Sequence, residues 1–425
     1  MSQPVTANSS ETPPPLEVEA ARQRILAQIA VLPGEPLPLL QAAGSFAVAR
    51  HAASHALPPF DNSAMDGYAL GLPEGAAETA AGTYFRVTGE QPAGAALGLT
   101  VAPGEAVRIF TGAPVPAGCG AVAMQEDVDR VGEQIVLREP VTPGEFVRRA
   151  GGDLARGQAL FAAGDRLTPA RLALLASQGV GAVTVPRPAR VAVLATGDEL
   201  RAPGETLGPG EIYESNGVML AALARACGAE VTVLPRARDE RGDLDAKLAQ
   251  GLHGHDALVV AGGVSVGERD LVKERLRAAG VGIDLWRVHM QPGKPFVYGC
   301  RPTMTATAGA AGGGPCHVFG LPGNPVSSFV TFLLFVRPAI LRLMGASNSA
   351  AGLRAVPAVA AVELTHRGDR PHYLRGILDE HGRFAPAGRQ ESHALFALSQ
   401  SNALVRLEPG TTHAAGSPLQ ALLWD

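Results

Sequence analysis

The chain has 425 residues, of which 46% are hydrophobic and 18% charged, and its formal net charge is −4 at pH 7. At about 150 residues per domain, this length predicts several domains with ample chain for a large core. The near-neutral charge and the lack of any basic run exclude a nucleic-acid binder held mainly by phosphate contacts.

The cysteines and the apolar stretches indicate the compartment. Four cysteines are widely spaced and form no CxxC pair, which suits neither a zinc site nor a disulfide framework and favours a reducing compartment. Residues 1–20 lack a signal-peptide pattern and are rich in Pro, Ser, Thr and Glu, which is typical of a disordered tail. The longest apolar stretch, FVTFLLFV, is too short to span a bilayer. We therefore expect a cytoplasmic protein that binds neither membranes nor nucleic acid.

The first part of the chain, up to residue 187, alternates short apolar runs with Gly/Pro turns, as in YFRVTGEQPAG and AVRIFTGAPVPAG. Turns at this density predict a β-rich module over residues 61–150. Two helical patterns flank it, VEAARQRILAQIAVL and PARLALLASQG. We therefore predict a linking domain that is split between residues 21–60 and 151–187.

From residue 188 the pattern becomes a regular alternation of strands and helices. RVAVLAT, EVTVLP and DALVVA predict buried strands, and SNGVMLAALARACG, LDAKLAQGL and DLVKERLRAAG predict helices between and after them. IDLWRVHM and CHVFG predict further strands, and PVSSFVTFLLFVRPAILRLM predicts a long buried helix. This alternation is typical of a multidomain α/β protein whose central domain, residues 188–345, is a doubly wound parallel sheet. The short strands that follow predict a C-terminal β barrel over residues 346–425.

Polar turns follow five strands of the predicted sheet. They are TGDEL with Asp198 and Glu199, RARDE with Asp239, GGVSVGERD with Asp270, QPGKP with Lys294, and GLPGNPVS with Asn324 and Ser327. Ligands bind such sheets in the crevice at the carboxyl ends of the strands. Five polar turns at that edge therefore predict a ligand site.

The turn GGVSVGERD is the most informative of the five. Gly262, Gly263 and Gly267 carry no Cβ, so backbone N–H groups can approach a ligand, and Ser265 can donate a hydrogen bond. A helix that begins near Asp270 directs its positive end at the same place, which favours phosphate. A carboxylate beside a phosphate site is typical of Mg²⁺ binding, which uses few protein ligands.

Each turn also has a simpler interpretation. Asp270 and Asp239 are the two expected Mg²⁺ ligands, but Asp is also a favoured helix cap, so either could serve only in that way. In GLPGNPVS, Gly323 allows a left-handed turn, Asn324 caps a helix and Pro325 occupies its first position, which could be a rigid helix start alone. Lys294 could be a solvated loop residue, although the chain has only three lysines.

Two turns of the N-terminal half are ordinary when taken by themselves. FDNSAMDGYA carries Asp66 ahead of a glycine, which is common hairpin chemistry, and TGAPVP at Thr111 is a Pro/Gly turn. Asp66 has no evident partner close by in the sequence.

Together, eight stretches resemble one family closely: molybdopterin molybdenumtransferase of the MoeA type, which is related to the gephyrin E domain. The stretches are FDNSAMDGYA, RIFTGAPVPAGCGAVAMQED, VRRAGGDL, LATGDEL, GGVSVGERD, QPGKP, GLPGNPVS and SHALFALSQSNAL. They occur in family order from about Asp61 to Ala403, so the resemblance covers most of the chain.

The resemblance implies a transferase that inserts molybdate into the dithiolene of adenylylated molybdopterin and releases AMP, with Mg²⁺ required. It also implies a four-domain fold and a homodimer in which Asp66 and Thr111 face the α/β domain of the partner chain. Molybdopterin adenylyltransferase and molybdoenzyme chaperones are the protein partners it suggests. The functional positions that it transfers to this chain are Asp66, Thr111, Asp153, Glu199, Asp239, Asp270, Lys294, Pro322, Pro325 and Ser392.

One position departs from the family pattern. Many members carry a second lysine shortly before the PGKP lysine, and here that position is Gln291, which brings no charge. Attraction of molybdate would then depend more on Lys294, with Arg370 and the Ser392 hydroxyl as further charge-assisted donors.

Three other functions fit less well. A molybdopterin adenylyltransferase would lack the FDNSAMDGYA module and the β-rich C-terminal part. A scaffold protein related to gephyrin would be expected to carry an additional domain or a long linker. A nicotinamide oxidoreductase would have a GxGxxG turn after the first strand, and none is present.

Overall fold

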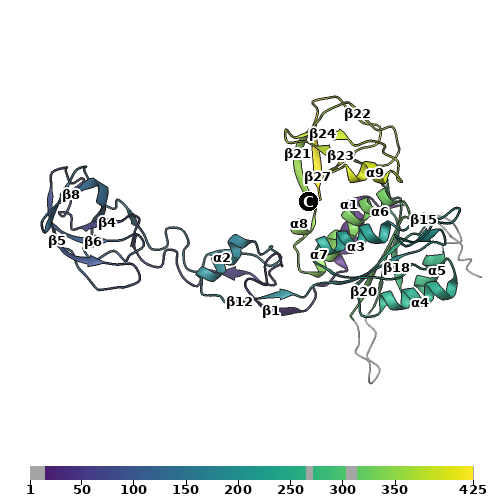
Figure 1. Ribbon diagram of the computed structural model, residues 1–425, viewed down its shortest axis with the longest axis horizontal. Coiled ribbons are helices and arrows are strands. Elements are labelled where there is room, and N and C mark those ends of the chain that lie inside the picture. The colour runs from purple at the N-terminus through teal and green to yellow at the C-terminus, as the bar shows by residue number, and fades with distance from the viewer. Residues whose placement is uncertain (1–14, 265–270, 303–313, 425) are drawn as a thin grey trace, which may run out of the picture. The chain divides into compact units, whose positions relative to one another are not determined.

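The computed structural model describes residues 15–264, 271–302 and 314–424 (Figure 1). The chain divides into two compact units. Unit 1 comprises the N-terminal residues through Val48, Ala163–Thr168, and the chain from Ala182 onward. Unit 2 comprises Ala49–Ala162 and Pro169–Gly181. The two segments expected to form one linking domain are therefore divided between the units, and the predicted domain boundaries stay predictions.

A six-stranded sheet lies at the centre of unit 1. Its strands are, in spatial order, β16 (Glu230–Val233), β13 (Arg190–Ala195), β17 (Ala257–Ala261), β20 (Cys316–Leu321), β19 (Pro295–Arg301) and β18 (Gly282–Arg287). The first four run parallel to one another, which confirms the parallel α/β core. β19 pairs antiparallel with both of its neighbours, so the complete sheet is mixed.

β19 was not expected from the sequence, because its run PFVYGC follows a proline-rich turn and shows no alternation. It forms a hairpin with β18. Since β19 reverses the chain direction, β18 lies parallel to β20, and the turn between β18 and β19 lies at the carboxyl edge of the parallel strands. The hairpin thus brings QPGKP to the edge where the other polar turns are found.

Helices cover both faces of this sheet because its central strands are apolar on both sides. On β13, Val191 and Val193 pack into one core cluster together with residues of α3 (Asn216–Ala226). Ala192 and Leu194 point the other way and pack with residues of α4 (Arg241–Leu252) and α5 (Leu271–Ala278). Figure 1 shows α4 and α5 together at the sheet. We call this sheet with its helices, residues 190–343, the α/β domain.

The long apolar helix is continuous over Pro325–Leu343 and consists of α6 (Pro325–Thr331), a π-helical turn (Phe332–Val336) and α7 (Arg337–Leu343). It is long and apolar enough to cross a membrane, but 89% of its most apolar window is buried inside the protein. It is therefore a core helix. The π-helical turn ends two residues before Pro338, which has no backbone N–H to continue the regular bonding pattern.

Helix α1 (Val18–Ala27) packs on the same core through Val18, Ala21 and Ile25. Residues 18–20, which were expected in the disordered tail, are thus helical because Val18 is buried there. β1 (Gly34–Pro38) then pairs antiparallel with β12 (Ala182–Pro186). In this way the chain enters and leaves the segment that contains unit 2 along two paired strands.

The C-terminal part forms the expected closed barrel, in the order β21-β24-β23-β25-β27. The strands are β21 (Arg354–Ala360), β23 (His372–Leu378), β24 (Arg383–Pro386), β25 (Ala403–Leu407) and β27 (Pro418–Leu423). Ala403, Val405 and Leu407 of β25 fill the barrel, whereas Leu404 belongs to the core of the α/β domain. The short elements α8 (Asn348–Ala351), β22 (Leu364–Thr365), α9 (Leu395–Ser399) and β26 (Thr412–His413) lie between or before these strands.

Unit 2 is β-rich, as predicted. Its sheet has the order β7-β4-β6-β5-β9-β8, with β4 (Gly67–Leu70), β5 (Tyr84–Gln91), β6 (Glu105–Ile109), β7 (Ala121–Met124), β8 (Val128–Val131) and β9 (Gln134–Leu137). Tyr68 and Leu70 of β4 pack into one core cluster, and Ala69 packs into another on the opposite face. The remaining elements are β2 (His51–Ala52), β3 (Asn62–Ser63), a 3-10 turn (Gln125–Asp127), β10 (Val147–Arg148), β11 (Ala159–Phe161) and α2 (Pro169–Ser177).

Candidate active site

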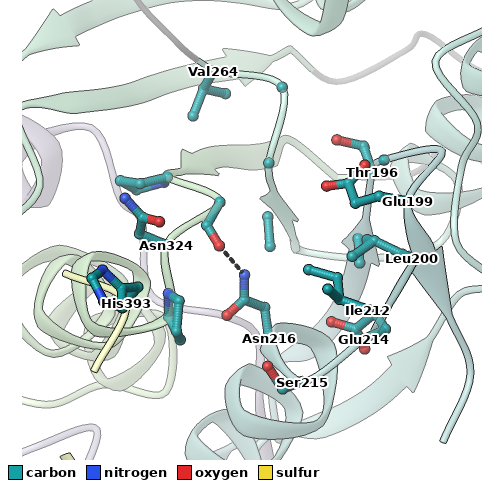
Figure 2. A pocket seen from close by; sticks show the side chains of 18 of the residues that line it. Thr196, Glu199, Leu200, Ile212, Glu214, Ser215, Asn216, Val264, Asn324 and His393 are labelled. Carbon is teal, nitrogen blue, oxygen red and sulfur yellow. Dashed lines mark hydrogen bonds between the residues drawn. The ribbon is translucent and has the colours of Figure 1, made fainter. Parts of the chain in front are cut away.

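A cavity of about 650 Å³ lies at the carboxyl ends of the parallel strands, where the sequence predicts a ligand site. Its lining comprises residues 195–197, 199, 200, 212–216, 239, 261–264, 295, 322–325, 393 and 395. Figure 2 shows Thr196 and Glu199 on one side of the cavity and Asn324 and His393 on the other. All five predicted polar turns therefore contribute described residues to one cavity, and QPGKP does so through Pro295.

The glycine pair after β17 is required by packing as well as by backbone conformation. Gly262 and Gly263 have φ angles of +95° and +65°, a backbone conformation that residues with a side chain rarely adopt. A Cβ on Gly262 would lie 2.7 Å from the Thr196 carbonyl oxygen, and one on Gly263 would lie 2.3 Å from a methyl of Val272. The Gly262 N–H donates to the Leu321 carbonyl at 3.0 Å, so this amide binds the neighbouring strand end rather than a ligand, contrary to our expectation.

Carboxylates gather on one side of the cavity. The backbone N–H of Asp239 donates to the Asp198 carboxylate at 3.2 Å. Burial raises the pKa of the Asp239 carboxyl, and the nearby charges of Asp198 and Glu199 raise it further. Glu240, not Asp239, occupies the cap position of α4. The helix-cap interpretation of Asp239 is therefore wrong, and a concentration of negative charge remains at the strand ends.

The turn GLPGNPVS connects the cavity to two other elements. Gly323 does not have a positive φ, so the expected left-handed turn is wrong, and its carbonyl instead accepts a hydrogen bond from the Asn216 amide at 2.6 Å. Asn324 precedes α6, but its side chain makes no capping bond and donates to the Ser392 hydroxyl at 2.9 Å. Ser392 also accepts the Val326 N–H through its carbonyl, at 3.1 Å. Pro322 and Pro325 line the cavity on either side of this turn.

The three residues expected to bind molybdate occupy different places. Lys294 is exposed on the β18–β19 turn, and its carbonyl accepts the Val288 N–H at 3.3 Å. Arg370 donates to the Met290 carbonyl at 3.3 Å and contacts Asp369 at 3.4 Å. Ser392 contacts Asn324 at the cavity edge. Among the residues that the structure describes, no hydrogen bond joins Lys294, Arg370 and Ser392 to one another.

Asp66 and Thr111 form a pair in unit 2. The Asp66 carboxylate accepts hydrogen bonds from the Thr111 N–H at 2.7 Å and from its hydroxyl at 2.8 Å. These bonds lower the pKa of Asp66. Asp66 therefore has a partner within unit 2, although the two residues are 45 positions apart in the sequence. Asp153 is exposed, and its N–H donates to the Leu57 carbonyl at 3.0 Å.

Three family models match the chain in order. They describe the MoeA N-terminal region (domains I and II) over residues 16–179, a probable molybdopterin binding domain over residues 192–342, and the MoeA C-terminal region (domain IV) over residues 357–424. Molybdopterin molybdenumtransferase 2 of Mycobacterium tuberculosis is 36% identical over 397 residues, which cover 92% of this chain and 94% of that protein. The chain belongs to the MoeA family.

Other relatives of this MoeA-family chain agree. Molybdopterin molybdenumtransferase of Nostoc sp. is 36% identical over 360 residues, or 84% of this chain and 80% of that protein. The crystal structure of a molybdopterin biosynthesis MoeA protein from Pyrococcus horikoshii OT3 matches with a TM-score of 0.80 and 25% identity, covering 96% of this chain and all of that one. The chain is therefore a transferase of molybdenum cofactor biosynthesis.

Several residues of the MoeA-type cavity were missed by sequence reasoning. Glu214, Ser215 and Asn216 at the start of α3 line it, and the Glu214 carboxylate accepts the Gly217 N–H at 2.6 Å. Ser215 occupies the cap position of α3, but its side chain makes no capping hydrogen bond. Thr196 is 6% exposed, and its hydroxyl has no hydrogen-bond partner among the described residues. Its position directly after a buried strand is the signal that could have identified it.

Arg375 was also missed, because it lies within the apolar strand pattern of β23. It is only 2% exposed, and its guanidinium donates to the Arg389 and Glu391 carbonyls, directly before Ser392. Burial lowers its pKa. A buried cation thus holds the segment that carries Ser392.

Some expected residues of the MoeA-type site lie outside the described residues, namely Ser265, Gly267 and Asp270. Within residues 15–264, 271–302 and 314–424, no group of three or more His, Cys, Asp and Glu side chains is arranged to hold a metal ion.

Proposed function

We propose that this MoeA-family transferase inserts molybdate into the dithiolene of adenylylated molybdopterin and releases AMP in a Mg²⁺-dependent reaction. The observation that carries the proposal is the cavity at the strand ends, which combines a helix start on one side with concentrated carboxylates on the other. A pyrophosphate and a divalent cation would need these two features together.

The phosphate side of the proposal rests on the long helix that begins at Pro325. Its first residue lines the cavity, and its first turn contains no acidic residue. Backbone N–H groups and the helix dipole there favour a negatively charged group. Asn216 and Asn324 hold this turn in place through their hydrogen bonds to the Gly323 carbonyl and the Ser392 hydroxyl.

The carboxylate side fits a cation. The raised pKa of Asp239 shows that its ionised form is destabilised by burial and by two neighbouring charges, and a bound cation would relieve this repulsion. Mg²⁺ usually takes one or two protein carboxylates and completes its shell with phosphate oxygens and water. We propose Asp239 and Asp270 as these ligands. When bound, the ion would neutralise charge on the phosphate groups as AMP leaves.

Lys294 and Ser392 are proposed to bind the molybdate dianion. The Ser392 hydroxyl accepts a hydrogen bond from Asn324, so its own proton remains available for donation to an oxyanion. Lys294 supplies a charge on a turn in which Gly293 is packed against α6: a Cβ there would lie 2.5 Å from a Thr331 methyl. The packed turn limits the positions of the exposed lysine.

We further propose a cytoplasmic homodimer in which the Asp66–Thr111 pair of one protomer serves the α/β domain of the other. The family resemblance supports the dimer, and four free cysteines are consistent with a reducing compartment. Inactive Asp66→Ala and inactive Asp270→Ala chains should regain activity when they are mixed under conditions that allow subunit exchange. Exchange without any recovery would contradict the shared site.

AMP release from adenylylated molybdopterin, measured with molybdate at a series of Mg²⁺ concentrations, tests the function. The wild-type protein should release AMP only with Mg²⁺ present, and Asp239→Asn and Asp270→Asn should require much more of it. The matched control is Asp245→Asn, since Asp245 lies on α4 but pairs with Arg275 at 2.6 Å. AMP release that is independent of Mg²⁺ in the wild type would overturn the proposal.

A further inference from the structure

Arg108 lies close to the Asp66–Thr111 pair in unit 2. It belongs to β6, shortly before Thr111, and the register of the sheet pairs it with Tyr68 of β4, shortly after Asp66. The Thr111 N–H and hydroxyl are the main causes of the lowered pKa of the Asp66 carboxyl, and the nearby charge of Arg108 lowers it further. The part of unit 2 that carries the pair therefore also carries a cation.

Neutral and aromatic groups hold the Arg108 guanidinium in place. It donates to the Tyr68 hydroxyl at 3.2 Å and to the Gln125 side-chain oxygen at 2.9 Å. It also lies 5.4 Å from the ring centroid of Tyr68 and 5.5 Å from that of Phe110. Aromatic faces attract a guanidinium and stack on its plane, and Tyr68 is only 2% exposed. The position of the guanidinium is thus set before any ligand binds.

No carboxylate forms an ion pair with Arg108 among the residues that the structure describes. Arg86 of the same sheet, by contrast, pairs with Glu105 at 2.6 Å. The bonds to Tyr68 and Gln125 use two of the five N–H donors of a guanidinium, and both acceptors are uncharged. The side chain is partly exposed. A fixed, partly exposed guanidinium without an ion-pair partner suits an anion with several oxygens, such as phosphate.

We propose that Arg108 is a further substrate-binding residue, which binds a phosphate group of adenylylated molybdopterin in the same half-site as Asp66 and Thr111. It would also offset the charge of Asp66, which by itself would repel the phosphates of the substrate. The assignment rests on the proposed function for the identity of the substrate and for the homodimer. The fixed guanidinium itself consists of contacts within unit 2.

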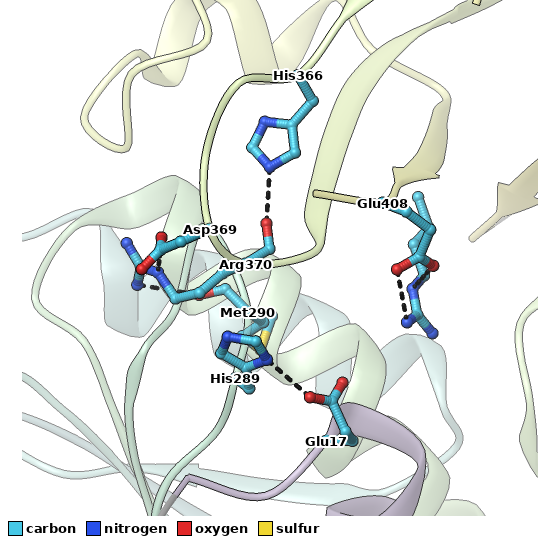
Figure 3. A network of polar contacts seen from close by, with 8 residues as sticks. Glu17, His289, Met290, His366, Asp369, Arg370 and Glu408 are labelled. Atoms are coloured by element: carbon cyan, nitrogen blue, oxygen red, sulfur yellow. Dashed lines mark hydrogen bonds and ion pairs between the residues drawn. The ribbon is translucent and has the colours of Figure 1, made fainter. Parts of the chain in front are cut away.

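Calorimetric titration of the full-length protein with adenylylated molybdopterin tests the assignment. Arg108→Gln should raise the dissociation constant on the order of ten- to a hundredfold, the effect of losing a charge-assisted hydrogen bond. Arg108→Lys keeps the charge and should lose less. Arg406→Gln is the matched control, because it removes the same charge from β25, where Arg406 pairs with Glu408 at 2.8 Å (Figure 3). Equal dissociation constants for Arg108→Gln and Arg406→Gln would overturn the proposal.

A change at Gln125 separates substrate binding from support of the sheet. Gln125→Glu keeps an acceptor for Arg108 but turns the hydrogen bond into an ion pair, which neutralises the guanidinium. A substrate-binding Arg108 should then bind the phosphate severalfold more weakly, whereas an Arg108 that only supports the sheet should leave the dissociation constant unchanged. Gln134→Glu adds the same charge at an exposed position of β9 and should have no effect.

Subunit mixing assigns Arg108 to its half-site. Under conditions in which Asp66→Ala and Asp270→Ala chains restore AMP release, Arg108→Ala should complement Asp270→Ala but not Asp66→Ala. Recovery with Asp66→Ala alone would place Arg108 in the other half-site and overturn the proposal. If the wild-type protein does not bind adenylylated molybdopterin, the proposed function fails. Titration with inorganic pyrophosphate then still decides the anion site, since Arg108→Gln should bind it more weakly than the wild type and equal binding would exclude the site.

Discussion

Replacement of Gly263 by alanine should destabilise the α/β domain at the edge of the cavity. Two costs add. At φ +65° an alanine adopts the left-handed conformation, which costs about 1–2 kcal/mol. Its Cβ would also lie 2.3 Å from a Val272 methyl, and Val272 is 2% exposed, so the core must shift at a cost of about 1–3 kcal/mol. We therefore expect Gly263→Ala to lower the free energy of unfolding by about 2–5 kcal/mol.

Two further variants separate these costs. Gly254 has a φ of +75° but has no atom within 4 Å of an added Cβ, so Gly254→Ala should show only the conformational cost. Val272→Ala removes the clashing methyl and should be less harmful in the Gly263→Ala background than alone. The free energy of unfolding is measured by urea titration with circular dichroism, and binding of adenylylated molybdopterin is measured in parallel. Equal losses for Gly263→Ala and Gly254→Ala would refute the steric argument.

Three other expectations follow from buried or paired groups. Burial lowers the pKa of His317 from 6.5 to about 4. As the pH falls through this range, the unfolded chain therefore binds a proton at His317 before the folded chain does. About 3 kcal/mol of the free energy of unfolding should be lost between pH 6.5 and 4. His317→Gln should lose less, which urea titrations at pH 7 and 4.5 would show, and an equal loss would contradict the assignment. Thr111→Val removes the hydroxyl bond to Asp66 and should reduce the rate of AMP release at least tenfold, whereas Thr111→Ser should retain most of the rate. Equal rates in the two variants would contradict a functional role of the Asp66–Thr111 hydrogen bond. Arg375→Met frees the segment before Ser392 and should raise the molybdate requirement, and an unchanged requirement in a folded variant would exclude that role.

Apolar periodicity and turn chemistry were sufficient to predict the parallel core. The strands at Arg190–Ala195 and Ala257–Ala261 are short continuous apolar runs bounded by Gly-containing turns, and runs of this length favour a strand buried on both faces. Because parallel strands end at one edge, the clustering of TGDEL, RARDE, GGVSVGERD and GLPGNPVS around one site could also be predicted. The eight ordered motifs identified the family, which the comparisons confirm.

The hydrogen-bond partners of the site residues could not be predicted in this way. Asp66 and Thr111 are 45 residues apart, and Asn324 and Ser392 are 68 apart, so no local pattern connects them. We expected Arg370 to contact the oxyanion because its positive charge would attract a dianion. The packing of the barrel against the β18–β19 turn instead directs its guanidinium to the Met290 carbonyl. β19 was missed for a similar reason, since its place follows from pairing with β18 and β20 rather than from its own sequence.

The sequence by itself therefore determined the parallel core, the sheet edge at which the polar turns gather, and the family. Local burial and turn preferences depend on neighbouring residues and can be recognised in the chain. Only the tertiary structure decided which polar groups remain available to a ligand. The N–H of Gly262 is already bonded to the Leu321 carbonyl, whereas the Ser392 hydroxyl accepts a bond from Asn324 and keeps its own proton for donation. The physical reason is that a hydrogen bond depends on distance and direction in space, and these are set by the packing of segments far apart in the chain.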